Sequence, residues 1–355
     1  MERSSSRSVS EILAEQYARI FSDRFSNIKP EDWRKPWISA TPCPAQNIGG
    51  NVYSGGNQFF LSLLTSMSGW ELPLFLTDRQ CSRLGVHITK GEHAFPIACV
   101  REWMRDESGL KRPAISPQEW RKLPESEQQG YVRKETLLYY RGYNISQTDF
   151  AQRLPERMES IRERYRNAEV GLTRDIAIPE ADLMLKEQRW LCPIREVSSA
   201  QAYFSPREDA ITVPMREQFP DRGQFYGTLF HEMAHSTGTQ ERLGRDMSGI
   251  FGTPSYAREE LVAELGSAIL CTRAGIDATI SEHNLQYLKS WTEALGGDPK
   301  TVTSVIQDAS RAADLMADTM HLQQRPAIDL SDMRKDLEES KEAQKSEESH
   351  HVMKR

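Results

Sequence analysis

Residues 225–238 read FYGTLFHEMAHSTG and contain the pattern His231-Glu232-x-x-His235. The apolar residues around this pattern recur at helical spacing, and four residues make about one turn of α-helix, so both imidazoles project from the same face. Two histidines placed in this way can bind one Zn²⁺, with the glutamate aimed at the same point. Gly238 is a natural C-cap residue that would end the helix. The stretch therefore predicts a helix that supplies two ligands of a catalytic zinc site.

The acidic residue between the histidines indicates catalysis. A zinc ion lowers the pKa of a water molecule, and Glu232 would accept the proton as general base while the metal polarises a carbonyl group. A DNA-binding module with a purely structural zinc ion is a further interpretation, but such a site would not need Glu232. We therefore expect a zinc metallopeptidase whose substrate is a peptide or a host protein.

The third zinc ligand is expected in the helix that contains Arg258-Glu259-Glu260-Leu261-Val262-Ala263-Glu264. This segment resembles the second helix of the thermolysin-like zincins (gluzincins). The resemblance implies that Glu260 binds the metal and that Glu264, which stands where the family has aspartate, orients a histidine. Glu264 and Glu259 stay open as alternative ligands. Tyr256, one turn before Glu260, is a candidate donor to an oxyanion, with packing at the helix start as the alternative.

The length of 355 residues is typical of two domains, and the pattern along the chain predicts an α+β protein. Strands are expected at residues 74–76, 86–89, 95–100 and 136–143, and a hairpin at 202–213. Helices are expected at residues 223–237, 255–274, 281–295 and 301–320, so the second domain is mainly helical with a small hairpin or sheet. The predicted units are an N-terminal α+β domain at 1–152, a helical linker at 153–172, the zincin-like domain at 173–325 and a charged, disordered tail at 326–355.

Several classes of protein are excluded. The longest strongly apolar stretch, residues 59–64 (FFLSLL), is too short to span a membrane, and the N-terminus lacks the apolar core of a signal peptide. The five cysteines are odd in number and never form CxxC, so neither a disulfide framework nor a zinc ribbon is indicated. We therefore expect a cytoplasmic protein with reduced thiols and no membrane contact.

The N-terminal domain mixes aromatic, amide and basic residues, as a surface for single-stranded nucleic acid would. Residues 1–150 hold 19 basic and 17 acidic residues, whereas the rest of the chain holds 26 and 34. The N-terminal domain is therefore the better partner for a polyanion. The candidate contacts with single-stranded DNA are Trp33, Lys35, Trp37, Asn47, Tyr53, Asn57, Arg79, Gln80, Lys90, Tyr140, Asn144 and Gln147.

Sequence blocks in both domains resemble one family. Residues 30–60, 74–98 and 139–149, followed by AYFSPREDAITVP, FYGTLFHEMAHSTG and SYAREELVAELGSAIL, are similar in content and order to the ArdC-type antirestriction proteins of plasmids and mobile elements. The resemblance covers about residues 8–320. It departs at Tyr53-Ser54-Gly55-Gly56-Asn57, where the family has Tyr-Arg-Gly-Ile-Asn and therefore one more basic residue.

The resemblance implies a single-stranded-DNA-binding N-terminal domain joined to a zincin-like metallopeptidase domain, and a relation to the N-terminal part of plasmid conjugative primases. It also implies a role in protecting incoming single-stranded DNA from host restriction during conjugation. The alternative is a cytoplasmic zinc metallopeptidase whose N-terminal domain binds protein.

Overall fold

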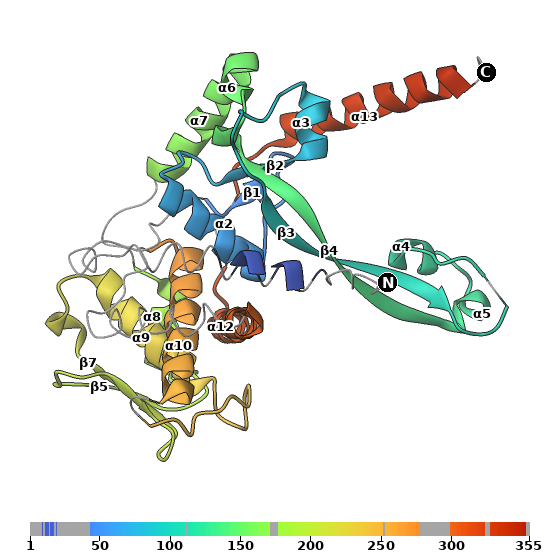
Figure 1. Ribbon diagram of the computed structural model, residues 1–355. Coiled ribbons are helices and arrows are strands. Elements are labelled where there is room, and N and C mark those ends of the chain that lie inside the picture. The colour runs from blue at the N-terminus through green and yellow to red at the C-terminus, as the bar shows by residue number, and fades with distance from the viewer. Residues whose placement is uncertain are drawn as a thin grey trace, which may run out of the picture.

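The computed structural model describes most of the chain (Figure 1). The described residues are 9, 11–13, 15–17, 19, 43–110, 112–170, 177–250, 253–276, 299–323 and 327–352. Three predicted DNA contacts, Trp33, Lys35 and Trp37, lie outside this part of the chain, as does the helix expected at 281–295.

The N-terminal part is built on a four-stranded sheet of order β1-β2-β4-β3. Its strands are β1 (Gln46–Asn47), β2 (Leu74–Thr77), β3 (Phe95–Asp106) and β4 (Tyr131–Asn144). β1 is parallel to β2, and the other neighbours are antiparallel. β3 and β4 pair far beyond the end of β2 and project from the body as a two-stranded ribbon (Figure 1).

The ribbon is longer than the sequence pattern predicts, because charged residues interrupt the apolar alternation in its outer half. Its tip carries the short helices α4 (Pro117–Trp120) and α5 (Glu125–Gln128). The strand expected at residues 86–89 does not form. Ile88 makes only an isolated bridge to Thr148, since Gly85 in the left-handed conformation turns the chain directly after α3.

From residue 43 onward, the described N-terminal part also contains the helices α2 (Gly55–Ser68), α3 (Asp78–Leu84), α6 (Phe150–Arg153) and α7 (Pro155–Val170). α3 begins with a capping box between Thr77 and Gln80. Helix α7 falls in the predicted linker, but it is not a free connection. Its Met158 and Ile161 are buried in one core with Leu74 and Leu76 of β2.

In its described residues, the C-terminal part combines a three-stranded sheet of order β5-β7-β6 with four helices. These elements are α8 (Pro179–Glu187), β5 (Ile194–Val197), β6 (Tyr203–Ser205), β7 (Ala210–Pro214), α9 (Arg222–Ser236), α10 (Pro254–Ala274) and α12 (Pro299–Met320). β6 and β7 form the predicted antiparallel hairpin. α9 packs against that hairpin and against α10, which in turn contacts α12. The α+β class is therefore confirmed, and the small sheet and the helices expected at 223–237, 255–274 and 301–320 are present.

The two parts share a hydrophobic core. Phe59, Phe60 and Leu63 of α2 are buried in the same cluster as Val305 and Ile306 of α12. Tyr17, from the described helical positions near the N-terminus, stacks on Phe60 with ring centroids 3.9 Å apart. The contact between the parts is therefore apolar rather than a loose polar junction.

The prediction of a disordered tail at residues 326–355 is wrong for the described part of this segment. Residues 331–352 form helix α13 (Ser331–Val352), and Leu330, Met333 and Leu337 are buried in the core of the N-terminal part. Arg164 of α7 donates to both carboxylate oxygens of Asp332, at 2.8 and 2.9 Å. The sequence pattern hid this helix because three apolar residues on one stripe anchor an otherwise charged segment.

Within the described ranges, no helix is both long and apolar enough to cross a membrane. All five cysteines are free thiols.

Candidate metal centre

Helix α9 presents His231 and His235 on one side, as their spacing predicts. Asp221 caps the start of the helix by accepting a hydrogen bond from the Gln224 amide. The two imidazole rings are nearly perpendicular, and their Nε2 atoms lie 3.1 Å apart. Both side chains are mostly buried, with exposed fractions of 15% and 12%. Two nitrogen atoms therefore face one point at the surface of α9.

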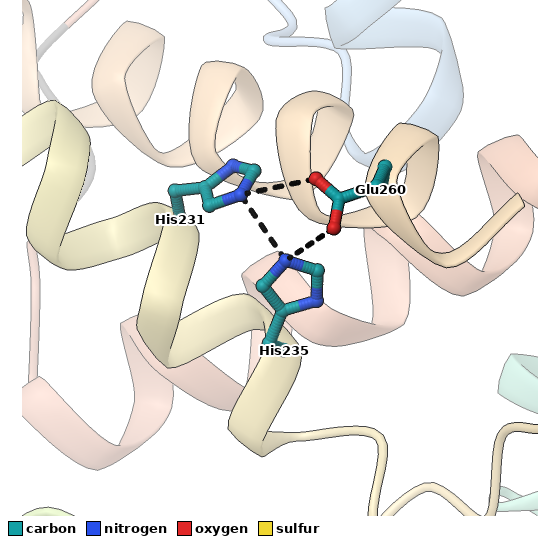
Figure 2. Close-up of side chains that lie close together, drawn as sticks. All are labelled: His231, His235 and Glu260. Atoms are coloured by element: carbon teal, nitrogen blue, oxygen red, sulfur yellow. Dashed lines mark hydrogen bonds and ion pairs between the residues drawn. The ribbon is translucent and has the colours of Figure 1, made fainter. Parts of the chain in front are cut away.

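Helix α10 brings Glu260 to the same point. One carboxylate oxygen lies 3.7 Å from Nε2 of His231, and the other lies 3.6 Å from Nε2 of His235. Figure 2 shows both rings turned toward this carboxylate from the neighbouring helix. The candidate ligand atoms of the three residues lie within 4.8 Å of one another. α10 can supply this side chain because Thr253 and Pro254 begin the helix two turns earlier.

The donor set fits a divalent metal ion. Two imidazole nitrogens and one carboxylate are a common set for catalytic zinc, and bonds of about 2.05 Å would hold two nitrogens about 3.3 Å apart in a tetrahedral arrangement. The observed separation of 3.1 Å is close to that value. The three residues therefore need little movement to hold an ion.

The electrostatic surroundings also favour a cation. Burial would lower the pKa of His231, but Glu264, Glu260 and Glu232 outweigh that effect and raise the pKa to about 10. Burial would raise the pKa of Glu260, but its contacts with His231 and His235 lower the pKa to about 2. The carboxylates therefore stabilise positive charge between the two helices, which a metal ion or a proton can supply.

The two glutamates that the sequence left open as ligands lie behind the histidines. Oε1 of Glu264 is 3.5 Å from Nδ1 of His231, and Oε1 of Glu259 is 3.2 Å from Nδ1 of His235. Glu259 can therefore accept the Nδ1 proton of His235, which leaves Nε2 of that ring free for a metal, whereas Glu264 lies close to Nδ1 of His231 without forming a hydrogen bond to that atom. This position is the one expected for Glu264, whereas Glu259 is an additional partner of the same kind.

Arg245 holds Glu259 in place, and sequence reasoning missed it. Its guanidinium donates to both oxygens of Glu259, to the hydroxyl of Thr237 and to the backbone carbonyl of Ala234, all at 2.7–2.8 Å. Arg245 is 5% exposed and Glu259 is 7% exposed. In the sequence Arg245 is not distinguished from Arg242, because its role depends on how the loop after α9 folds back onto α10.

Glu232 and Tyr256 lie beside the three candidate ligands. Glu232 is 7% exposed, and no hydrogen bond to its carboxylate is found within the described part of the chain. No other described residue therefore holds its carboxylate by a hydrogen bond. The Tyr256 hydroxyl hydrogen-bonds to Glu260, which contributes to the lowered pKa of that carboxyl group.

The predicted DNA contacts in the described N-terminal part divide into two groups. Three are exposed, namely Arg79, Lys90 and Tyr140. The others serve the fold, and the structure places them in turns, caps and cores: Asn47, Tyr53, Asn57, Gln80, Asn144 and Gln147.

The sequence predicted a DNA-binding surface for the amides of this second group because asparagine and glutamine are residue types that bind nucleic acid. Asn144 is fully buried and donates to the Leu72 carbonyl at 2.8 Å. Gln147 is 2% exposed and donates to the His93 carbonyl. Asn57 both donates to and accepts from the backbone of Ala98. Backbone groups in turns and at strand ends need such partners, so these amides are not available to a ligand.

Comparison with known protein families identifies both parts of the chain. Residues 180–309 match the family described as zincin-like metallopeptidase, which implies a divalent metal. The fold and the paired histidines thus belong to a zincin-like metallopeptidase domain. Residues 14–145 match the N-terminal domain of the anti-restriction factor ArdC. The chain is therefore an ArdC-type protein, and the resemblance seen in the sequence is confirmed.

Curated relatives agree with this assignment. The protein y4eC of Sinorhizobium fredii is 27% identical over 319 residues, which cover 88% of this chain and 93% of that protein. Two DNA primases TraC of Escherichia coli are 29% identical, over 79% and 80% of this chain. The chain spans only 18% and 25% of the length of these primases.

Two solved structures are similar over most of the chain. The metal-free antirestriction protein ArdC of plasmid R388 is 26% identical, with a TM-score of 0.57, and the match covers 87% of this chain and 99% of ArdC. The Mn(II)-bound structure is 25% identical, with a TM-score of 0.58, and the match covers 90% of this chain and all of ArdC.

Proposed function

We propose that this ArdC-type protein binds single-stranded DNA through its N-terminal part and hydrolyses peptide bonds with zinc in its C-terminal domain. The proposal depends chiefly on one observation: His231, His235 and Glu260 converge on one point with Glu232 beside them. The R388 relative has been seen with Mn(II), so a divalent ion is expected here as well. Imidazole and carboxylate ligands are also well suited to zinc.

Each residue has a separate task in this proposal. His231, His235 and Glu260 hold the ion, which when bound polarises a peptide carbonyl and acidifies a water molecule. Glu232 accepts the proton of the attacking water and returns it to the leaving amine. Tyr256 donates to the carbonyl oxygen as charge develops there. Glu259 and Glu264 fix the orientation of the two imidazole rings.

The DNA-binding part of the proposal rests on relatives. The N-terminal residues match the ArdC N-terminal domain, and the chain aligns with part of two conjugative DNA primases. A protein of this type would protect incoming single-stranded DNA from host restriction during conjugation. We place it in the cytoplasm, where free thiols stay reduced.

Glu232→Gln tests whether the site is catalytic. The amide is nearly isosteric with the carboxylate but cannot accept the proton, so the variant should keep one metal per chain while hydrolysis of a quenched-peptide library falls by at least 100-fold. Glu241→Gln is a matched control, because Glu241 is an exposed glutamate of the same domain. Full hydrolysis by the Glu232 variant would refute the role of general base.

The same variant separates the two activities in cells. If protection of transferred DNA survives Glu232→Gln, protection depends on DNA binding and not on proteolysis. If the wild-type chain does not bind single-stranded DNA at low salt, the ordinary metallopeptidase with a protein-binding N-terminal domain is favoured instead.

A further inference from the structure

The β3–β4 ribbon is an exposed structure with a large surface. Phe95 pairs with Gly142 at its base and Asp106 with Tyr131 at its tip, which corresponds to a length of roughly 40 Å. Ile97 at its base is 4% exposed, and Met104 nearer the tip is 6% exposed, where it forms a bridge to Ile115. A two-stranded ribbon gains little stability by itself, so its sequence is free to serve a partner.

The register separates the ribbon side chains into two faces, because residues directly opposite each other project to the same side. One face carries Arg101, Trp103, Arg105, Lys134 and Tyr140, and we call it the basic face. The opposite face carries Glu102, Asp106, Arg133, Glu135, Tyr139 and Arg141, and Arg141 lies 3.6 Å from a carboxylate oxygen of Asp78. All three acidic residues of β3 and β4 therefore lie on the opposite face.

The charges on the two faces are used differently. Arg133 pairs with both Glu102 and Glu135, so this cation of the opposite face is already engaged by two carboxylates. On the basic face, Arg101 and Arg105 are exposed and form no ion pair within the described residues. Lys134 of this face is paired with Glu107, at 2.7 Å. The two arginines therefore remain available to an anionic partner.

Two aromatic rings share this face with the cations: Trp103 lies between Arg101 and Arg105, and Tyr140 lies nearer the base, opposite Ile97. The indole of Trp103 donates from Nε1 to the Thr136 hydroxyl of the neighbouring strand, at 3.2 Å, which ties the ring to the ribbon. Tyr140 is 48% exposed on the same face. It lies six residues along β4 from Lys134, the partner of Trp103, or roughly 20 Å away. A ring fixed in this way offers a platform for stacking at no further cost in side-chain freedom.

We infer that the basic face of the β3–β4 ribbon is the surface that binds single-stranded DNA. The inference rests on the proposed function and adds the site. Cations and aromatic rings spaced along one face match a chain of phosphates with unpaired bases, because arginines follow the backbone and each base can stack on a ring. A duplex would keep its bases inside and gain nothing from Trp103 or Tyr140.

The test measures binding of a fluorescent oligothymidylate to the full-length chain by anisotropy. Trp103→Ala and Tyr140→Ala should each weaken binding about 5- to 100-fold, whereas Tyr140→Phe should bind like the wild type. Arg101→Ser should lower the slope of log affinity against log salt by about 0.7. The matched controls are Tyr139→Ala and Arg133→Ser, the same residue types on the opposite face.

The outcomes distinguish the site from the function. Suppose that the wild type binds DNA, and that the variants of both faces lose affinity equally or that no variant loses affinity. The basic face is then not the binding surface, although the protein still binds DNA. Failure of the wild type to bind at low salt overturns both. Thermal unfolding checks that each variant is folded, and Trp103→Phe, which keeps a ring but loses the bond to Thr136, serves if Trp103→Ala is unstable. The Trp103→Phe variant should then bind the oligonucleotide more tightly than the Tyr140→Ala variant does. An affinity of Tyr140→Ala equal to that of the wild type would again refute the proposal that the basic face binds DNA.

Discussion

Replacement of Arg245 by Met would test how the buried ion pair behind the metal centre works. Met keeps much of the side-chain volume but removes the four hydrogen bonds of the guanidinium. Glu259 is 7% exposed, so its carboxylate would remain in the protein interior without its cation. Breaking such a pair from one side costs about 3–5 kcal/mol. Glu259 would also hold His235 less firmly, and loss of a comparable carboxylate partner weakens metal affinity about 10- to 100-fold.

Two measurements report these effects separately. Urea unfolding with chelator present gives the change in the free energy of unfolding without metal, and competition with a chromogenic chelator gives the zinc affinity. Arg207→Met is the control, because Arg207 is exposed in the turn between β6 and β7. The double variant Arg245→Met, Glu259→Gln should be more stable than Arg245→Met alone, since no unpaired charge then remains in the interior.

A loss of stability below about 1 kcal/mol for Arg245→Met, together with unchanged zinc affinity, would refute this account of the pair. The same conclusion would follow if the double variant lost more free energy of unfolding than the sum of the losses of the two single variants.

Two further outcomes are expected. Changing His231 and His235 together to Ala should reduce zinc from about one ion per chain to none, as measured by atomic emission, and full occupancy in that variant would contradict the metal centre. Hydrogen bonds from Arg164 hold the pKa of Asp332 below its ordinary range, so this pair stabilises the docked α13 fully above the ordinary carboxyl pKa and is lost as pH falls through the lowered value. Asp332→Asn should therefore weaken the protection of the α13 amides against hydrogen exchange at neutral pH, and this protection should then change less as the pH is lowered. An equal pH dependence of the protection in both proteins would contradict the pairing.

The sequence predicted the parts of the site that depend on local spacing. His231 and His235 share a face because of the helical repeat, and the position of Glu260 followed from a motif resemblance. The contacts of Glu259 and Arg245 were not predictable, because they depend on how the loop between α9 and α10 folds back. The spacing of residues within one segment does not show which side chains of another segment will contact it.

The fold was predictable to a similar degree. The hairpin at β6 and β7 and the helices α9 and α10 follow from periodicity and turn residues. The amides of Asn144 and Gln147 misled the prediction of a surface, because amide side chains satisfy backbone groups as readily as they bind ligands. Helix α13 was missed because average composition conceals a narrow apolar stripe.

The docking of α13 has a consequence for how such proteins can be recombined. The N-terminal unit is discontinuous: Gln46 near its start exchanges two hydrogen bonds with the backbone of Ile328, 282 residues later in the chain. A hybrid made with a relative by one crossover between the two domains would join an N-terminal unit to a foreign closing segment. Leu330, Met333 and Leu337 would then meet surfaces to which they are not fitted. Functional chimeras should therefore require two crossovers, so that both ends of the chain come from the same parent.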